Sequence, residues 1–359
     1  MNADFDKLRK RANPTSNLES PITNFHLQMQ RTIRWGIIGC GDVAEKKSGP
    51  PLYRTPGSEL VAVMRRDVTR AKDFARRHNA QRWYTDARAL IDDEQVNAVY
   101  IASPHYLHRA HATLAAEAGK IVFCEKPMGA NARDAQAIVD VCKKNRVLLA
   151  VAYYRRYWPT VRSAQRMLKE KIIGDVVSAR VQLSDYFPDT PRADWLVSKK
   201  MAGGGALANA GSHWIDLTRF LIGEIAEVSA YAESKRFQVD ETVAVLMRTR
   251  EGIPVSFTAT WQSQLRVNEI EIIGTRGKML IGPLSEGQWS VFLPDRVPEV
   301  RQFFNSGPAH TELVNELVSR LQRGKPSPIP GEEAVAAWRV MEAIYKSCKT
   351  GKRIAILHR

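Results

Sequence analysis

The feature that most constrains the fold is an apolar segment at residues 34–39 that runs directly into a glycine-rich turn. The segment reads Arg-Trp-Gly-Ile-Ile-Gly, which is typical of a buried parallel strand. In the GxGxxA turn, the first glycine permits a tight turn, the second lets a pyrophosphate approach the backbone, and the small third residue lets helix and strand pack closely. The turn therefore predicts a dinucleotide site made by Gly39, Gly41, Asp42, Val43 and Ala44.

Short apolar runs alternate with amphipathic stretches over the next hundred residues, which predicts a doubly wound parallel sheet. The apolar runs lie at 60–64, 98–102, 121–123 and 147–151, and the helical patterns at 67–78, 87–92, 105–118 and 132–145. We assign residues 32–152 to this Rossmann domain. Because Pro50 and Pro51 interrupt a helix, the helix after the glycine turn is predicted to be short or to end early.

After Ala152 the pattern changes to successive β-rich segments, which favours a largely antiparallel sheet. These segments lie at 176–183, 228–233, 242–248, 254–261 and 268–273, with helical patterns at 161–170, 208–221, 311–323 and 332–347. We predict a second, α+β domain over residues 153–359, whose C-terminal helix can pack back on the first domain. Residues 1–31 are polar without a sustained period and predict a tail or arm.

The formal net charge of +15, from 53 Lys and Arg against 38 Asp and Glu, invites a nucleic-acid hypothesis. The basic residues are spread along the chain, so an anionic cofactor or substrate is the better expectation and nucleic acid is unlikely as a partner. Four scattered cysteines form no CxxC pair, and no apolar stretch approaches the ~18 residues of a membrane span. With no apolar N-terminal segment either, we expect a cytoplasmic protein without a membrane partner.

The end of the second predicted strand indicates which dinucleotide binds. An NAD site usually has a carboxylate about 20 residues after the glycine turn, where it accepts from the ribose 2′-hydroxyl. Here Arg65 occupies that place and Arg66 follows, and guanidinium groups suit a 2′-phosphate. We predict NADP(H) in preference to NAD(H); in the alternative, both arginines are solvated and Asp67 binds the ribose.

Two segments carry candidate catalytic groups. Lys126 follows an apolar strand, at the edge of the sheet where ligands bind in open α/β folds, and it can hold a substrate hydroxyl and help to move its proton. Asn209 and His213 are four residues apart on a predicted helix, and histidine is the usual general acid or base near neutral pH. In the alternative, Lys126 is an ordinary surface lysine and His213 is a structural histidine.

These motifs, taken together, resemble a known family. In order, they are Gly39-x-Gly41-x-x-Ala44, Ser103-Pro104-x-x-x-His108, Glu125-Lys126-Pro127, and Gly204-Gly205 before Asn209-x-x-x-His213-x-x-Asp216. Over residues 32–357 the chain resembles the glucose–fructose oxidoreductase / inositol 2-dehydrogenase (Gfo/Idh/MocA) family. The resemblance implies hydride transfer between a nicotinamide cofactor and a carbinol carbon of a sugar, cyclitol or related polyol. It also implies a large open sheet in the second domain, through which a homo-oligomer, a dimer or tetramer, often forms.

The resemblance further implies roles for individual residues. Lys126 would be the catalytic lysine and His213 the acid/base, while Asn209 stands where the family often has aspartate, which leaves proton transfer to the other two. The cofactor site would include a second group of residues, with the first three beside the nicotinamide: Ser103, Pro104, His105, His108, Glu125 and Lys126. The substrate pocket would add Tyr153, Arg156, Trp195 and Lys200 to Lys126, Asn209 and His213.

Other functions remain open at this stage. A nucleotide-binding sensor of the same fold is the main alternative, and an imine- or diene-type reductase is disfavoured because His213 stands where some such relatives have tyrosine. His105, His108 and His111 have a spacing that metal ligands use, but Pro104 and the lack of nearby carboxylates argue for no metal. Arg192 and Lys200 hint at an anionic sugar.

Overall fold

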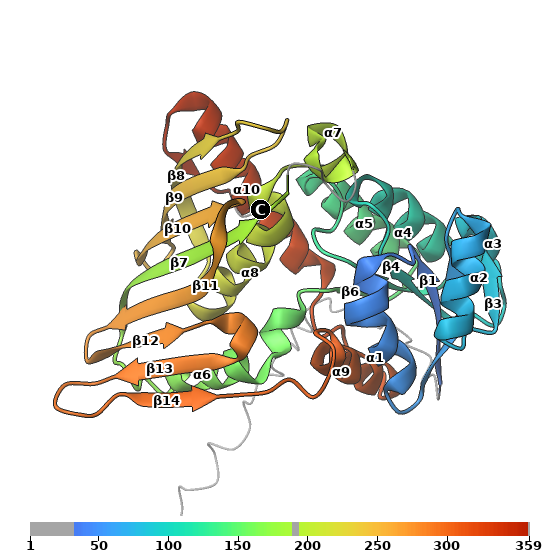
Figure 1. Cartoon of the computed structure of the whole chain (residues 1–359), viewed down its shortest axis with the longest axis horizontal. Coiled ribbons are helices and arrows are strands. Elements are labelled where there is room, and N and C mark those ends of the chain that lie inside the picture. Colours follow the sequence, from blue (N-terminus) through green and yellow to red (C-terminus); the bar gives the residue numbers. More distant parts are fainter. Residues whose placement is uncertain (1–31, 189–193, 358–359) are drawn as a thin grey trace, which may run out of the picture.

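The computed structural model describes residues 32–188 and 194–357, so the predicted N-terminal arm and Arg192 lie outside the described residues. The described chain forms two β-sheets with helices between them (Figure 1). In this part of the chain, no helix is long and apolar enough to cross a membrane.

The first sheet has six parallel strands in the order β3-β2-β1-β4-β5-β6, which confirms the predicted doubly wound arrangement. The strands are β1 Ile33–Ile38, β2 Ser58–Met64, β3 Arg82–Tyr84, β4 Ala98–Ile101, β5 Ile121–Cys124 and β6 Leu149–Val151. Every residue of β4, β5 and β6 is buried, as expected for parallel strands covered on both faces. The sequence did not predict β3, because this three-residue edge strand has no buried residue and so lacks an apolar run.

Helical segments connect the strands from β2 to β6: α2 Val68–Arg77, α3 Ala87–Ile91, the 3₁₀ turn η2 His105–Leu107, α4 His108–Glu117 and α5 Ala132–Lys144. Of these, α2, α3 and α5 begin at a capping side chain. Asp67, Asp86 and Asn131 precede α2, α3 and α5, and each accepts a hydrogen bond from the backbone N–H three residues on, at 3.0, 3.1 and 2.8 Å. Such caps satisfy donors that a helix start otherwise leaves unpaired.

The helix after the glycine turn is short, as predicted, but it does not end before the two prolines. A π-helical turn, η1 (Ala44–Ser48), leads into α1 (Gly49–Arg54), and Pro50 and Pro51 stand in the first turn of α1. A proline is tolerated in the first turn because its missing N–H would have no partner inside the helix. The helix is therefore short, as expected, but the prolines do not break it.

The second sheet has nine strands in the order β14-β13-β12-β11-β7-β10-β9-β8-β15. They are β7 Val176–Tyr186, β8 Ile225–Glu233, β9 Thr242–Thr249, β10 Pro254–Thr260, β11 Gln262–Gly274, β12 Gly277–Ile281, β13 Gln288–Phe292, β14 Glu299–Gln302 and β15 Ile354–Ala355. Only β7 and β10 pair in parallel among these described strands, which confirms a mostly antiparallel sheet. The strands from β12 onward were not predicted, since they are short and β14 is exposed at every position.

The remaining helices lie against one face of this sheet and against the first domain. They are η3 Tyr154–Tyr157, α6 Pro159–Lys169, η4 Asp194–Val197, α7 Lys199–Ala202, η5 Leu207–Gly211, α8 Ser212–Leu221, η6 Leu284–Glu286, α9 Thr311–Gln322 and α10 Gly331–Thr350. α10 packs on β8 and also on α5, where Trp338 Nε1 donates to the Met128 carbonyl at 3.1 Å and Ala132 N donates to Glu342 Oε1 at 2.8 Å. The C-terminal helix α10 thus contacts elements of both domains.

Candidate active site

The glycine turn meets each requirement of a pyrophosphate site. Gly39 has φ +101°, and a Cβ there would lie 2.6 Å from the backbone of Ala102 and Ser103, so only glycine fits. A Cβ on Gly41 would meet no described atom within 4 Å, so this backbone is open to a ligand. Ala44 is fully buried against the first domain's core. The residues present therefore fit a dinucleotide.

Arg65 lies against this turn. Its Nη1 donates to the carbonyl of Cys40 at 2.5 Å, which holds the guanidinium next to the glycines. Arg66 is exposed beside it. Asp67, the alternative ribose ligand, caps α2 by accepting from Arg70 N at 3.0 Å.

Residues 103–105, which we call the nicotinamide loop because they are predicted to lie beside the nicotinamide, are held in place by two histidines. His108 is fully buried, with Nε2 2.8 Å from the Ser103 carbonyl and Nδ1 3.1 Å from the Pro127 carbonyl. Burial lowers the pKa of His108 to about 4 and that of His105 to about 3, so both are neutral at pH 7. His105 Nδ1 lies 3.2 Å from the Ala202 carbonyl. Nδ1 of His105 and Nε2 of His108 are therefore engaged by the backbone.

The side chains around His105, His108 and His111 do not support the alternative of a metal site. The Nδ1 atom of His111 hydrogen-bonds the hydroxyl of Ser103 at 2.9 Å. Over residues 32–188 and 194–357, no group of three or more His, Cys, Asp or Glu is arranged to hold a metal ion.

Lys126 connects the two domains at the carboxyl end of β5. Its Nζ donates to the Asn209 carbonyl at 2.9 Å, across 83 residues of sequence. Burial lowers the pKa of Lys126 to about 8; the Glu125 charge opposes this, and the charges of Lys47 and Arg155 add to it. The lysine can therefore change its charge near neutral pH, which suits proton transfer.

Glu125 has its carboxylate enclosed by protein donors. Oε1 accepts from the Tyr100 hydroxyl at 2.6 Å and from His310 Nε2 at 2.7 Å, and Oε2 accepts from the Lys126 backbone N–H at 3.0 Å. Burial alone would raise the pKa of Glu125, but His310, Lys126 and Tyr100 hold it down at about 2. Glu125 thus lies beside Lys126, and both of its carboxylate oxygens accept hydrogen bonds from the protein.

His213 is buried in a position that fits an acid/base. Its ring packs edge-on against Tyr153 and Tyr154, at centroid distances of 5.9 and 4.7 Å. Among the described residues, neither ring nitrogen of His213 nor the Tyr153 hydroxyl has a hydrogen-bond partner, although all three atoms are buried. Burial, followed by the charge of Lys126, lowers the pKa of His213 well below its usual value, so the ring is neutral at pH 7. Unpaired buried polar atoms of this kind are what substrate hydroxyls would satisfy.

The segment before His213 is shaped by close packing. A Cβ on Gly203 would lie 2.2 Å from the Ala130 carbonyl oxygen, and one on Gly205 2.0 Å from the Asp240 carbonyl oxygen. The close approach that the glycines permit is therefore to other parts of this chain. The π-helical turn η5 follows, and it contains Asn209, whose carbonyl faces Lys126. Single π turns occur often at functional sites.

Arg156, predicted in the substrate pocket, is engaged elsewhere. Its guanidinium binds Asp216 through two hydrogen bonds, at 2.8 and 2.6 Å, and Glu333 at 2.7 Å. Arg219 joins the same group by pairing with Glu224 and Glu333. We call these five residues the arginine cluster, and we assign Arg156 to it as a structural residue rather than as a substrate contact.

Two further residues predicted in the pocket, Trp195 and Lys200, lie on η4 and α7. Trp195 packs edge-on against His105 at 4.8 Å, next to the nicotinamide loop. Lys200 is exposed on α7. Sequence reasoning missed Arg155, which lies over the Trp158 and Trp214 rings with Nε and Nη1 buried and, within the described chain, unpartnered.

His310 was also missed, because nothing in its local sequence signals a role. It precedes α9, is fully buried, and reaches Glu125 across 185 residues. We call Glu125, Lys126, His213 and His310 the lysine cluster.

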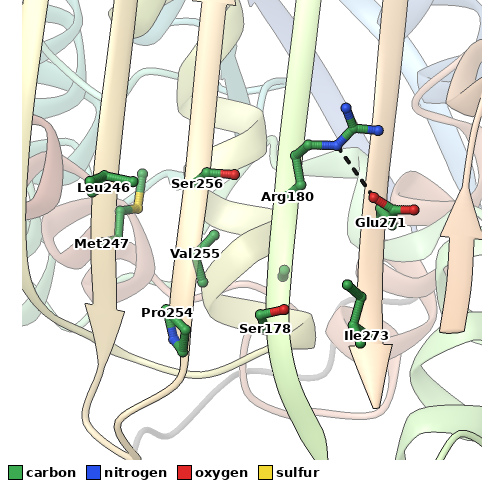
Figure 2. Close-up of a pocket in the computed structure, with 10 residues that line it drawn as sticks. Ser178, Arg180, Leu246, Met247, Pro254, Val255, Ser256, Glu271 and Ile273 are labelled. Atoms are coloured by element: carbon green, nitrogen blue, oxygen red, sulfur yellow. Dashed lines mark ion pairs between the residues drawn. The ribbon is translucent and has the colours of Figure 1, made fainter. Parts of the chain in front are cut away.

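A separate hollow of about 440 Å³ lies on the outer face of the second sheet (Figure 2). It crosses β9, β10, β7 and β11, and Arg180 pairs there with Glu271 at 3.4 Å. Since it contains none of the lysine cluster or the glycine turn, it is not the candidate active site.

Fold and site together define a class: an oxidoreductase whose Rossmann domain holds a dinucleotide and whose second domain brings a histidine to the carboxyl edge of the sheet. Residues 33–153 match the oxidoreductase family with an NAD-binding Rossmann fold, and residues 161–280 match the GFO/IDH/MocA C-terminal domain. The chain therefore belongs to the Gfo/Idh/MocA family, as its motifs predicted, and is an oxidoreductase with an NAD-binding Rossmann domain.

Similar proteins include named enzymes. The chain is 32% identical over 321 residues to Oxidoreductase P35 of Formosa agariphila, covering 88% of this chain and 98% of that protein. It is 30% identical over 329 residues to human trans-1,2-dihydrobenzene-1,2-diol dehydrogenase, covering 88% and 96%. A solved levoglucosan dehydrogenase in complex with NADH and levoglucosan has the same fold, with a TM-score of 0.83 at 24% identity over 91% of this chain and all of that one.

Proposed function

We propose that this protein is an NADP(H)-dependent oxidoreductase that transfers a hydride to or from a carbinol or carbonyl carbon of a sugar, cyclitol or related polyol. The observation that carries the proposal is the lysine cluster: Lys126 is hydrogen-bonded to the Asn209 carbonyl at 2.9 Å, and His213 is buried with both nitrogens unpaired within the described chain. The names of relatives support the substrate class, since dihydrobenzenediol and levoglucosan both carry secondary hydroxyls.

A nicotinamide held at the glycine turn would supply hydride transfer to or from the reacting carbon. The side chains of the protein would accept or donate the proton. In the direction of oxidation, the neutral His213 ring takes the proton of the substrate hydroxyl, and the Lys126 ammonium donates a hydrogen bond to the same oxygen. The carbon loses a hydride and the oxygen a proton, which leaves a carbonyl. The Tyr153 hydroxyl is placed to bind another substrate group, because it is buried beside His213.

The preference for NADP(H) is supported by Arg65 and Arg66. Arg65 is held next to the glycine turn, and the competing carboxylate of Asp67 is committed to capping α2. A guanidinium binds a 2′-phosphate by charge and by paired hydrogen bonds.

The first test is turnover across a panel of sugars, cyclitols and dihydrodiols with NADP⁺ and NAD⁺. The panel should include uronates, since the cations Lys47, Lys126 and Arg155 act together on His213. A wild-type rate that disappears in the Lys126→Ala/His213→Ala double variant supports the enzyme, and nucleotide binding without turnover on any substrate supports a sensor.

We further propose that the protein forms a homo-oligomer through the outer face of the second sheet. α10 packs on β8 and η5 on β10 on the inner face, whereas Tyr231 and Leu246 on the outer face are 72% and 67% exposed. A second copy would cover this face. Sedimentation of the full chain and of a Leu246→Glu variant tests the proposal, because a monomeric wild type or an unaltered oligomer in the variant contradicts it.

A further inference from the structure

Among the described residues, Arg155 is a cation with buried, unpaired nitrogens. Its Nε and Nη1 have no hydrogen-bond partner in this part of the chain, although the residue as a whole is only half-buried. Its neighbour Arg156 pairs instead with Asp216 and Glu333. A guanidinium keeps its charge in proteins, and a buried charge without a partner is costly. The contrast between the two arginines indicates that Arg155 pairs with a group that the protein itself does not supply.

Two tryptophans hold the Arg155 guanidinium in place. It lies 5.5 Å from the ring centroid of Trp158 and 5.2 Å from that of Trp214. Both rings are themselves fixed, since Trp214 is 1% exposed and Trp158 Nε1 donates to the Ala309 carbonyl at 3.0 Å. Cation–π contacts offset part of the cost of burying the charge, but they leave the N–H donors unpaired. The guanidinium is therefore oriented before any ligand arrives, which reduces the entropy lost on binding.

Two separate contacts connect Arg155 with the candidate acid/base. Trp214 follows His213 on α8, and Tyr154, which precedes Arg155 on η3, has its ring 4.7 Å from the His213 ring. Burial contributes most to the lowered pKa of His213, and the charges of Lys126 and Arg155 follow. The unpaired guanidinium thus lies beside the groups to which we assign proton transfer.

The buried carboxylates of this region, Glu125 and Asp216, are already paired. Both oxygens of Glu125 accept hydrogen bonds from the protein, and both oxygens of Asp216 accept from Arg156. A carboxylate on a ligand would pair with Arg155 through charge-assisted hydrogen bonds, which the planar guanidinium makes well. A phosphate fits less well, because its three oxygens and its charge of nearly −2 usually take several donors.

We propose that Arg155 determines the specificity of the reaction by binding a carboxylate of the substrate, so that the substrate is a sugar acid or a related acidic polyol. The inference deepens the proposed function and rests on it, because the acid is bound beside the groups that transfer the proton. The carboxylate itself takes no part in hydride or proton transfer, and it leaves unchanged with the product.

The variants separate the charge of Arg155 from its bulk. Arg155→Gln removes the charge and retains a polar side chain, whereas Arg155→Lys retains the charge and loses the planar set of donors. Arg162 offers a matched control, since its guanidinium also lies over an aromatic ring, that of Tyr157 at 5.0 Å, but is exposed on α6. Arg162→Gln therefore removes the same charge from a neighbouring helix.

The measurement is calorimetric binding, in the presence of NADPH, of sugars that differ in a single group. The pairs are glucuronate with glucose and galacturonate with galactose, in which a carboxylate replaces a hydroxymethyl group. We expect the wild type and Arg162→Gln to bind the acid of at least one pair about ten- to a hundredfold more tightly than its neutral partner, the range for hydrogen bonds to a charged group. Arg155→Gln should lose this preference through weaker binding of the acid, and Arg155→Lys should retain part of it.

Four outcomes overturn the inference. The first is a wild type that binds no acid more tightly than its neutral partner, and the second is a preference that survives in Arg155→Gln or, if that variant does not fold, is undiminished in Arg155→Lys. The third is a loss of NADPH affinity in Arg155→Gln as large as the loss of acid affinity, because Arg155 would then bind the cofactor phosphates. The fourth is tighter binding of a hexose phosphate than of either acid, which would contradict the carboxylate.

Binding can be measured without turnover, so the two proposals can fail separately. Tight binding of an acid through Arg155 without oxidation of any polyol would reject the proposed function and retain the carboxylate site. Turnover of neutral polyols without any preference for the acids would do the reverse.

Discussion

Two buried charged clusters share α8, since His213 belongs to the lysine cluster and Asp216 and Arg219 belong to the arginine cluster. They differ in how completely their polar atoms are paired. In the arginine cluster, each buried side-chain nitrogen and oxygen within the described chain has a partner. In the lysine cluster, both nitrogens of His213 and Nδ1 of His310 are buried without one. The comparison teaches that a fully paired buried cluster is costly to break, because removing one partner leaves an uncompensated charge, whereas buried polar atoms without a partner point to a ligand.

The largest expected effect is on catalysis. Replacing Lys126 and His213 together by alanine removes both groups assigned to proton transfer, and kcat should fall by at least about 10³-fold, as for the loss of general acid–base groups. Steady-state kinetics with the best substrate, beside nucleotide binding to show that the site is intact, provides the measurement. A double variant that keeps most of its activity would remove the distinction between the clusters.

The next effect is on stability, in the arginine cluster. Arg156→Ala leaves Asp216, which is 1% exposed, as an unpaired buried carboxylate, and the free energy of unfolding should fall by about 3–5 kcal/mol. Urea denaturation measures this, with the exposed Arg166→Ala on α6 as a control expected to change little. If Arg156→Ala instead raises KM in protein that is still folded, Arg156 belongs to the substrate pocket as the sequence predicted.

A smaller effect is expected at the glycine turn. Replacing Arg65 and Arg66 by alanine should weaken NADPH binding by about ten- to a hundredfold, the range for losing hydrogen bonds to a charged group, and leave NADH binding nearly unchanged. Quenching of tryptophan fluorescence in titrations with each nucleotide gives both affinities. Equal losses for the two nucleotides would contradict the 2′-phosphate assignment.

The smallest effect concerns acid stability. Since His105, His108 and His213 have pKa values below that of an unfolded histidine, the unfolded chain takes up protons first as the pH falls below about 6.5. The melting temperature should therefore decrease between pH 7 and pH 5. The decrease should be smaller in His108→Gln, and the same decrease in that variant would show that His108 is not buried as a neutral ring.

Some of the site could be predicted from sequence because its chemistry is local. Gly39, Gly41 and Ala44 act through backbone shape within six residues, and Arg65 follows one strand later at a spacing set by the βαβ unit. Lys126 was found because it ends a strand at the edge where ligands bind. The first sheet was predicted for the same reason, since β4, β5 and β6 are continuous apolar runs and β1 and β2 each contain one.

The remainder depends on contacts between distant segments. Arg155 and Arg156 are neighbours in sequence, yet one is paired with Asp216, 60 residues away, and the other has buried atoms without a described partner. His310 meets Glu125 only because α9 begins beside the first domain. The sequence by itself determined the dinucleotide turn and the order of the two sheets, because strand burial and turn geometry are properties of short segments. Tertiary structure alone decided which buried charges are paired, because pairing depends on distances that local sequence does not encode.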